Sequence, residues 1–262
     1  MFGSATWARW MRRRRHHTIS QCAAATTTSS PGRPISLYKT MRLPASNFPP
    51  RFNIAPTDQV PIVRVDPRDQ TRELVMARWG LIPGWMKEKP KIPHINARAE
   101  TAHKLPLFRE AFAKRRALIP ATGFLEWQAR ADRKQPYRFV REDMQPFAFA
   151  GLWEFTKLGG EDLLSTTIIV GEPNPLVAGV HDRMPVMLTP EDYDRWLDPA
   201  MSIDDLRAML KPYDPKMMKA YEVSHAVNSV KNDTPECVEP MPVSGPSAQP
   251  QINISDHRVG HP

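Results

Sequence analysis

The chain has 262 residues and a mass of 29.8 kDa, which is long enough to bury a substantial core. It contains no apolar run of membrane-spanning length and its mean hydropathy is −0.48, so the composition excludes a membrane-spanning protein. Two cysteines, Cys22 and Cys237, are too few for a disulfide framework or a four-thiolate zinc site. The 28 prolines predict short elements separated by turns, which favours a β-rich or mixed fold over a helical bundle.

The net charge of +8 is an N-terminal feature. No acidic residue precedes Asp58, whereas residues 1–57 contain nine lysines and arginines, so the remainder is close to neutral. The basic balance therefore does not by itself indicate a nucleic-acid partner.

Three regions are predicted from composition. Residues 1–47 form an atypical, basic, low-complexity segment, residues 48–243 form one folded domain, and residues 244–262 form a disordered tail rich in Ser, Pro, Gln and His. The N-terminal segment is open to three interpretations: an organelle transit peptide, a basic nucleic-acid-binding arm, or an artefact of the reading frame.

Regular elements are predicted in chain order within the domain. Apolar and β-branched runs indicate strands at 60–65, 73–79, 116–120, 137–140, 147–153 and 166–170. Helical periodicity and N-terminal signals indicate helices at 101–116, 190–196 and 202–210, the last capped by Ser202, and residues 217–223 form a final strand or turn. The predicted class is α+β, with a mostly antiparallel, barrel-like sheet and peripheral helices.

Polar residues stand out in a few short stretches. If residues 95–100 are extended, Asn96, Arg98 and Glu100 share one face, either as a solvated edge or as a site for an anionic substrate. Glu126 follows apolar residues, so its carboxyl is either partly desolvated, which suits acid–base chemistry, or exposed on an alternating strand. His181 is a candidate proton carrier or a structural histidine at a loop edge.

Other stretches carry weaker signals. Trp79 and Trp85 bracket a Pro/Gly-rich loop, where each ring is either a base-stacking platform or part of the core. Ser224 and Asn228 are candidate turn formers.

Taken in order, six motifs resemble the SOS-response-associated peptidase family, whose members process abasic sites in DNA. They are residues 51–56 (RFNIAP), 79–85 (WGLIPGW), 95–100 (INARAE), 123–127 (GFLEW), 181–185 (HDRMP) and 223–228 (VSHAVN). The resemblance covers about residues 48–240 and implies a barrel-like fold.

The resemblance also implies a mechanism. A cysteine exposed as residue two closes a thiazolidine with the aldehyde of an abasic site in single-stranded DNA, without metal or organic cofactor, and takes part in autopeptidase cleavage. Asn96 would position the reactants, Glu126 would transfer protons and His181 would assist ring opening. The implied DNA contacts are Arg51, Asn53, Trp79, Trp85, Arg98 and Arg183. The protein would act as a monomer in the cytoplasm, on the nucleoid when bound to DNA.

The sequence departs from the family at its N-terminus. Position two is Phe2, and Cys22, the nearest remnant of the family cysteine, lacks the following Gly-Arg. A shifted reading of the codons from Gln21 onward can spell Met-Cys-Gly-Arg-Tyr-Asn-His-Leu, which is the family's opening. We therefore hypothesise a single insertion or deletion between about Thr27 and Phe48.

Three functions follow as hypotheses. The first is an abasic-site crosslinking protein with peptidase and lyase-like chemistry in the SOS response. The second is a catalytically impaired module that binds single-stranded DNA, since the chain as written lacks the terminal cysteine. The third is a stand-alone peptidase.

Overall fold

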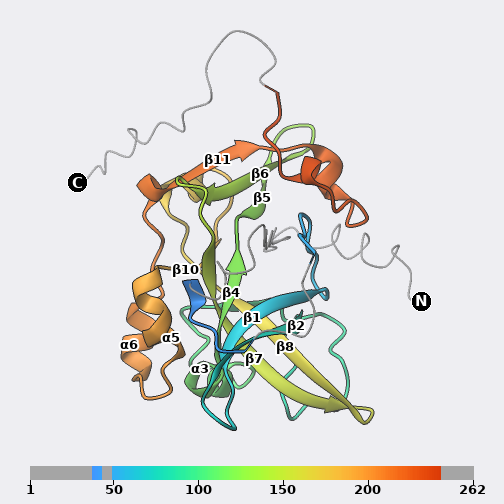
Figure 1. The fold of residues 1–262 in the computed structure, drawn as a ribbon. Helices are drawn as coiled ribbons and strands as arrows, with labels where there is room; N and C mark the ends of the chain where they lie inside the picture. The colour runs from blue at the N-terminus through green and yellow to red at the C-terminus, as the bar shows by residue number, and fades with distance from the viewer. Residues whose placement is uncertain (1–36, 43–48, 243–262) are drawn as a thin grey trace, which may run out of the picture.

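The computed structural model describes residues 37–42 and 49–242. Five of their strands close into a barrel in the order β7-β4-β1-β2-β8, because β8 also pairs with β7 (Figure 1). Only the β2–β8 pairing within this barrel is parallel. The bounds are β1 (Gln59–Val65), β2 (Arg72–Trp79), β4 (Arg116–Ala121), β7 (Phe147–Leu158) and β8 (Glu161–Gly171). The predicted α+β class with a mostly antiparallel, barrel-like sheet is confirmed.

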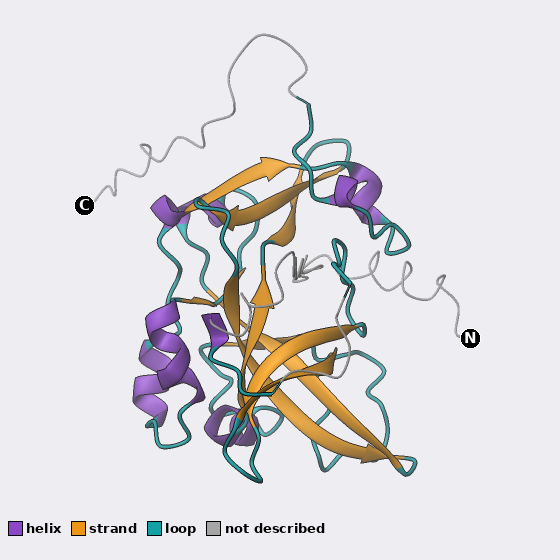
Figure 2. Ribbon diagram, viewed as in Figure 1, coloured by secondary structure: helices purple, strands orange, loops and turns teal. Residues whose placement is uncertain are grey.

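Shorter elements extend the barrel. The strands β3 (Asn96–Arg98) and β9 (Met184–Pro185) pair with β8, and β10 (Met187–Leu188) pairs with β7. A separate sheet contains β5 (Phe124–Ala129), β6 (Lys134–Arg141) and β11 (Met218–Glu222). The helices lie around the strands (Figure 2). They are α3 (Arg109–Lys114), α4 (Pro175–Ala178), α5 (Tyr193–Leu197) and α6 (Ile203–Ala208), with 3-10 turns η1 (Pro190–Asp192), η2 (Pro215–Met217), η3 (His225–Asn228) and η4 (Pro235–Cys237).

The barrel has two distinct ends. Because β1 and β4 run antiparallel, with Val63 opposite Leu118, the end of β1 at Val65 lies beside the start of β4. We call this the α3 end, since α3 leads directly into β4 there. The other end, where β4 continues into β5, is the β5 end, and Figure 1 shows the two at the bottom and top of the view.

Both faces of the barrel wall are buried, which explains why several strands read as continuous apolar runs. One cluster fills the inside and includes Trp79, Phe147 and Phe149, while a second covers the outside, where Phe112 contacts Trp196. The small sheet joins the inner cluster through Phe124, whose ring packs 4.9 Å from Phe139 and 6.1 Å from Phe149.

Two predicted helices differ from the structure. The helix predicted over 101–116 is wrong for its first half, because α-helix is confined to α3 and turns precede it. Pro106 accounts for the difference, since proline disfavours helical conformation in the residue before it and supplies no amide donor. The helix predicted from Pro190 begins as η1 and continues as α5. The Ser202 cap is confirmed, because its side chain accepts from the Asp205 amide.

The segment 37–42 packs against the barrel. Tyr38 is buried, donates a hydrogen bond of 2.8 Å to the Phe147 carbonyl and packs 5.6 Å from Tyr193. The rest of the predicted N-terminal segment and the predicted tail lie outside the described residues. No helix in the described part of the chain is long and apolar enough to cross a membrane.

Candidate active site

Glu126 reaches the β5 end of the barrel through the alternation of β5. Phe124 and Glu126 lie on one face of this strand, and Phe124 belongs to the inner barrel cluster. Leu125 lies on the other face, in a small cluster with Val223, Val227, Cys237 and Val238. The same alternation therefore carries the Glu126 carboxyl toward the barrel, where it is completely buried.

Gly123 makes this entry into β5 possible. A Cβ at this position would lie 2.8 Å from the Phe139 carbonyl oxygen and 2.9 Å from Arg138 Nε. Only glycine allows the chain to pass so close to β6 before it delivers Phe124 and Glu126 to their places.

The Glu126 carboxyl is fully desolvated. Neither of its oxygens has a hydrogen-bond partner among the described residues. Burial raises its pKa well above the ordinary value, and the nearby charge of Asp182 raises it further, while Lys134 acts in the opposite direction. Burial therefore favours the protonated form of this carboxyl, which suits a proton donor.

His181 lies beside this carboxyl. It follows α4, which Asn174 caps by accepting from the Val177 amide, and its Nε2 lies 3.9 Å from Glu126 Oε2. Its Nδ1 lies 3.1 Å from both the amide nitrogen and the carbonyl oxygen of Arg183, and 3.3 Å from Asp182 Oδ1. Both protonation states of Nδ1 therefore find a partner, as a proton carrier requires.

The strand β3 carries the amide and the guanidinium of the INARAE motif and pairs with the end of β8, next to the loop that contains His181. Ala97 is buried, so Asn96 and Arg98 point to the opposite face, as the sequence predicts for an extended segment. Asn96 Oδ1 is buried without a hydrogen-bond partner, and Arg98 is exposed with no ion pair among the described residues. Glu100, just beyond the strand, forms an ion pair with Arg183 and so ties β3 to the His181 loop.

A hydrogen bond that the sequence analysis did not predict joins β5 to the segment just before His181. Gln128 Nε2 donates a hydrogen bond of 2.9 Å to the Gly179 carbonyl. Gln128 lies two residues after Glu126, so the alternation of a strand places both side chains on one face. This alternation is the feature of the sequence that could have predicted the contact.

Two predicted DNA contacts are corrected by burial. Trp79 is 1% exposed, lies in the inner barrel cluster and donates its indole hydrogen to the Ile95 carbonyl at 2.9 Å, so a base cannot stack on it. Asn53 is fully buried, and its Nδ2 lies within hydrogen-bond distance of the carbonyl oxygens of Val227, Ser229 and Asn232. Both residues hold the fold together.

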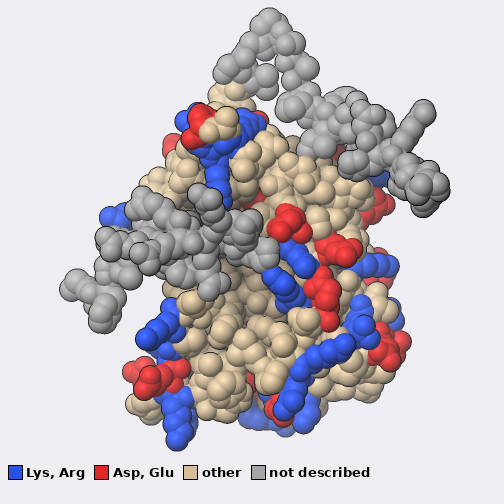
Figure 3. Space-filling view, turned by 180° about the vertical axis from the view of Figure 1, so that it is seen from behind, with Lys and Arg blue, Asp and Glu red and all other residues tan. Residues whose placement is uncertain are grey.

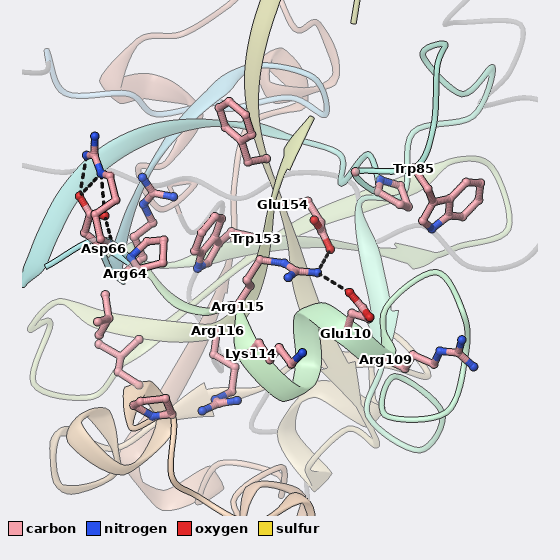
Figure 4. A pocket seen from close by; sticks show the side chains of 18 of the residues that line it. Arg64, Asp66, Trp85, Arg109, Glu110, Lys114, Arg115, Arg116, Trp153 and Glu154 are labelled. Atoms are coloured by element: carbon pink, nitrogen blue, oxygen red, sulfur yellow. Dashed lines mark hydrogen bonds and ion pairs between the residues drawn. The ribbon is translucent and has the colours of Figure 1, made fainter. Parts of the chain in front are cut away.

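The three arginines predicted to contact DNA differ in their ion pairs. Arg51 pairs with Asp58 and Asp233, and Arg183 pairs with Glu100, so only Arg98 of the three lacks an ion pair among the described residues. Figure 3 likewise shows lysines and arginines lying beside acidic residues on the face seen from behind. Trp85 is 65% exposed and lines a cavity at the α3 end (Figure 4). Cys22 lies outside the described residues.

Comparison with known proteins gives the same family as the motifs. The sequence model of the SOS response associated peptidase (SRAP) family matches residues 21–230. The abasic site processing protein YoqW of Bacillus subtilis is 43% identical over 202 residues, covering 75% of this chain and 89% of its own. The abasic site processing protein HMCES of Gallus gallus is 32% identical over 232 residues, covering 76% and 68%.

Solved structures agree with the fold. A crystal structure of a protein from Bordetella bronchiseptica superimposes with a TM-score of 0.67 at 30% identity, covering 78% of this chain and 99% of the other. One from Bacteroides thetaiotaomicron gives a TM-score of 0.66 at 29% identity, covering 72% and 84%. With the family match extending over most of its length, the chain belongs to the SOS response associated peptidase family.

Proposed function

We propose that this protein processes abasic sites in single-stranded DNA by forming a covalent thiazolidine with an N-terminal cysteine. The observation that carries the proposal is the Glu126 carboxyl, which is completely buried, has no hydrogen-bond partner among the described residues and lies 3.9 Å from His181 Nε2. A fold gains nothing from such a group, whereas a proton-transfer step requires one. The relatives' names, as abasic site processing proteins, support the choice of substrate.

The chemistry assigns Glu126 the role of acid. The cysteine α-amine adds to the aldehyde carbon of the ring-opened sugar and gives a carbinolamine. Glu126 protonates the carbinolamine hydroxyl, which leaves as water while the nitrogen lone pair forms a C=N bond. The sulfur then attacks that carbon, the C=N pair returns to nitrogen, and the thiol proton returns to Glu126. One water is lost overall, and no oxidant or metal is needed.

The neighbouring side chains have supporting roles in this proposal. His181 carries the proton between the sulfur and Glu126, because its Nε2 faces the carboxyl and its Nδ1 has partners in both protonation states. Asn96 Oδ1, which has no hydrogen-bond partner within the described ranges, accepts from the amine or a sugar hydroxyl. Arg98, exposed without an ion pair among the described residues, holds a phosphate next to the lesion.

The cysteine and Glu126 also provide an autopeptidase activity in this proposal. Cys22 is the only cysteine of the chain in the N-terminal region, and the match to the family model begins at residue 21. Cleavage would release a peptide ending just before this cysteine, and Glu126→Gln would abolish the release. Mass spectrometry of the purified chain and of the variant measures both.

The crosslinking proposal is tested on a chain that begins Met-Cys-Gly-Arg-Tyr and joins the present sequence at Leu37. Tyr38 then keeps its contacts with the barrel. This chain should give a heat-stable band shift with abasic single-stranded DNA, and serine in place of the new cysteine should abolish it, because serine cannot close a thiazolidine. Glu126→Gln should slow crosslinking by about 10²–10⁴-fold.

Two further variants separate chemistry from folding. His181→Ala should slow ring opening and reversal with DNA affinity retained, and Asn96→Ala should lose crosslinking with the thermal transition unchanged. If the rebuilt chain folds and binds DNA yet never crosslinks, the mechanism is wrong and the protein is a single-stranded DNA-binding module. Sequencing codons 15–50 of the gene tests the reading-frame hypothesis directly.

A further inference from the structure

The strand β5 contacts the loop after α4 at two matched positions. Glu126 and Gln128 lie on one face of the strand, about 7 Å apart along it. Gly179 and His181 are likewise two residues apart in the loop. His181 Nε2 lies 3.9 Å from Glu126 Oε2, and Gln128 Nε2 donates to the Gly179 carbonyl at 2.9 Å. The same strand that carries the carboxyl therefore also holds the loop that carries the imidazole.

The helix α4 gives this loop only limited support. It consists of a single turn, Pro175–Ala178, and helices this short have little stability of their own. On the β3 side, the loop is held by the ion pair between Arg183 and Glu100. On the β5 side, the hydrogen bond from Gln128 to the Gly179 carbonyl has the corresponding place. The catalytic candidate of the loop thus lies between two contacts, each made two residues away from it.

A second partner determines how the Gln128 amide is oriented. Arg130 Nε lies 3.2 Å from Gln128 Oε1, and a guanidinium only donates, so the group that it meets is the amide oxygen. The amide nitrogen is thereby turned toward the Gly179 carbonyl, which only accepts. A side chain at this position must therefore accept at one atom and donate at another, as an amide does.

Arg130 is itself fixed to the other two strands of the small sheet. Its Nη2 donates to the Tyr137 hydroxyl at 2.9 Å and to the Glu222 carboxylate, and its guanidinium carbon lies 5.9 Å from the centre of the Tyr137 ring. The Tyr137 hydroxyl donates to Glu222 at 2.9 Å. Tyr137 lies opposite Glu126 on β6, and Glu222 lies opposite Tyr137 on β11. A network across three strands therefore ends at the loop that contains His181.

This network is poorly placed to stabilise the fold. The Arg130 side chain is 40% exposed, and the contacts of Gln128 lie at the surface. Exposed polar pairs contribute little to stability, because water competes for both partners. The network fixes the position of one loop beside a buried carboxyl, and this effect on geometry is its main consequence.

We propose that Gln128 is a positioning residue that holds His181 next to Glu126, and that Arg130 orients Gln128 for this role. The inference rests on the proposed function, which gives His181 and Glu126 their parts in proton transfer. The 3.9 Å between their atoms exceeds the reach of a direct hydrogen bond, about 3.2 Å, so small displacements of the loop decide whether the two groups meet. A displacement of about 1 Å at such a site costs up to about 10²-fold in rate.

The first experiment measures the rate at which the cysteine-bearing chain crosslinks to abasic single-stranded DNA. Gln128→Leu removes both contacts, and Gln128→Glu keeps an acceptor for Arg130 but sets a carboxylate oxygen against the Gly179 carbonyl. Both should slow crosslinking by about 10–100-fold. DNA affinity should stay within about 2-fold and the thermal midpoint within about 4 °C. Gln145→Glu, at an exposed glutamine between β6 and β7, is the matched control and should have no effect.

A double variant separates positioning from a general structural role. If Gln128 acts through His181, adding Gln128→Leu to His181→Ala should slow crosslinking no further. Arg130→Leu should slow crosslinking in the same direction but less, since Gln128 then keeps its donor. Additive losses in the double variant, or slower crosslinking that is matched by an equal loss of DNA affinity, would overturn the proposal.

Hydrogen exchange gives a readout that needs no crosslinking and uses the chain as it stands. The amides of Val180 and His181 donate to the Val177 carbonyl within the loop. Gln128→Leu should speed their exchange, measured by mass spectrometry on peptides that span residues 175–185, and Gln145→Glu should not. Unchanged exchange together with unchanged crosslinking would show that Gln128 does not position His181. If exchange responds as expected but the cysteine-bearing wild type never crosslinks, the proposed function fails and takes the role in proton transfer with it.

Discussion

Replacing Glu126 by glutamine should change how the stability of the protein depends on pH. The native carboxyl is completely buried, neither oxygen has a hydrogen-bond partner in the part of the chain that the structure describes, and burial raises its pKa well above that of the unfolded chain. Above the unfolded pKa, the unfolded state therefore releases a proton that the native state keeps. Unfolding is favoured as the pH rises, so stability is greatest in acid and falls until the pH passes the raised native pKa.

The magnitude of this pH dependence is set by the ionisation of a single carboxyl group. Between the unfolded pKa, about 4.3, and the native value, the free energy of unfolding falls by up to about 1.4 kcal/mol per pH unit because of this group alone. Glutamine has nearly the same size and does not ionise, so Glu126→Gln removes this slope. The variant should be at least as stable as the wild type at neutral pH.

Urea denaturation followed by tryptophan fluorescence at a series of pH values measures the effect. Glu100→Gln is a matched control of opposite sign. Burial acts to raise the pKa of Glu100, but its hydrogen bonds and the ion pair with Arg183 lower it overall. The stabilisation from Glu100 is therefore present above the unfolded pKa and is lost as the pH falls. Parallel stability curves for wild type and Glu126→Gln would refute the reasoning and remove Glu126 from the acid role.

Three other predictions concern single positions. Arg98→Ala should reduce the salt dependence of single-stranded DNA binding by about one unit, measured by anisotropy from low to high salt, and an unchanged slope would place Arg98 away from the phosphates. Asn53→Ala should lower the free energy of unfolding by about 2 kcal/mol in urea titrations, because it removes the donor from the buried Val227 carbonyl and from the partly buried carbonyls of Ser229 and Asn232. Gly151→Ala should cost about 1–3 kcal/mol, since the new Cβ would lie 2.7 Å from Ile119 Cδ1, and adding Ile119→Val should restore part of the loss.

Local sequence patterns predicted most of the barrel. Apolar and β-branched runs placed β1, β2, β4, β7 and β8, although β7 and β8 extend beyond the predicted bounds because they pair with each other as far as Leu158 and Glu161. The strand β5 was not among the predicted elements. Its polar residues mask the pattern, and its place depends on the pairing with β6.

The motifs also identified candidate site residues, but not all of their environments. Asn96, Glu126 and His181 come from motifs that lie far apart in sequence, and the structure places the last two 3.9 Å apart. The same motifs predicted DNA contacts for Trp79 and Asn53, which the structure buries. A motif does not distinguish a residue that builds the site from one that contacts DNA. Burial decides that difference, and burial depends on the whole fold.

The sequence by itself therefore determined the fold class, the family and the short polar motifs, because these depend on periodicity and residue identity along the chain. Tertiary structure decided the direction in which the Glu126 pKa is shifted, since desolvation depends on every segment packed around the carboxyl. It also decided which of these arginines form ion pairs, because Asp58, Asp233 and Glu100 approach Arg51 and Arg183 only when the chain folds. Charge pairing and burial are properties of three-dimensional neighbours, and the linear sequence does not specify them directly.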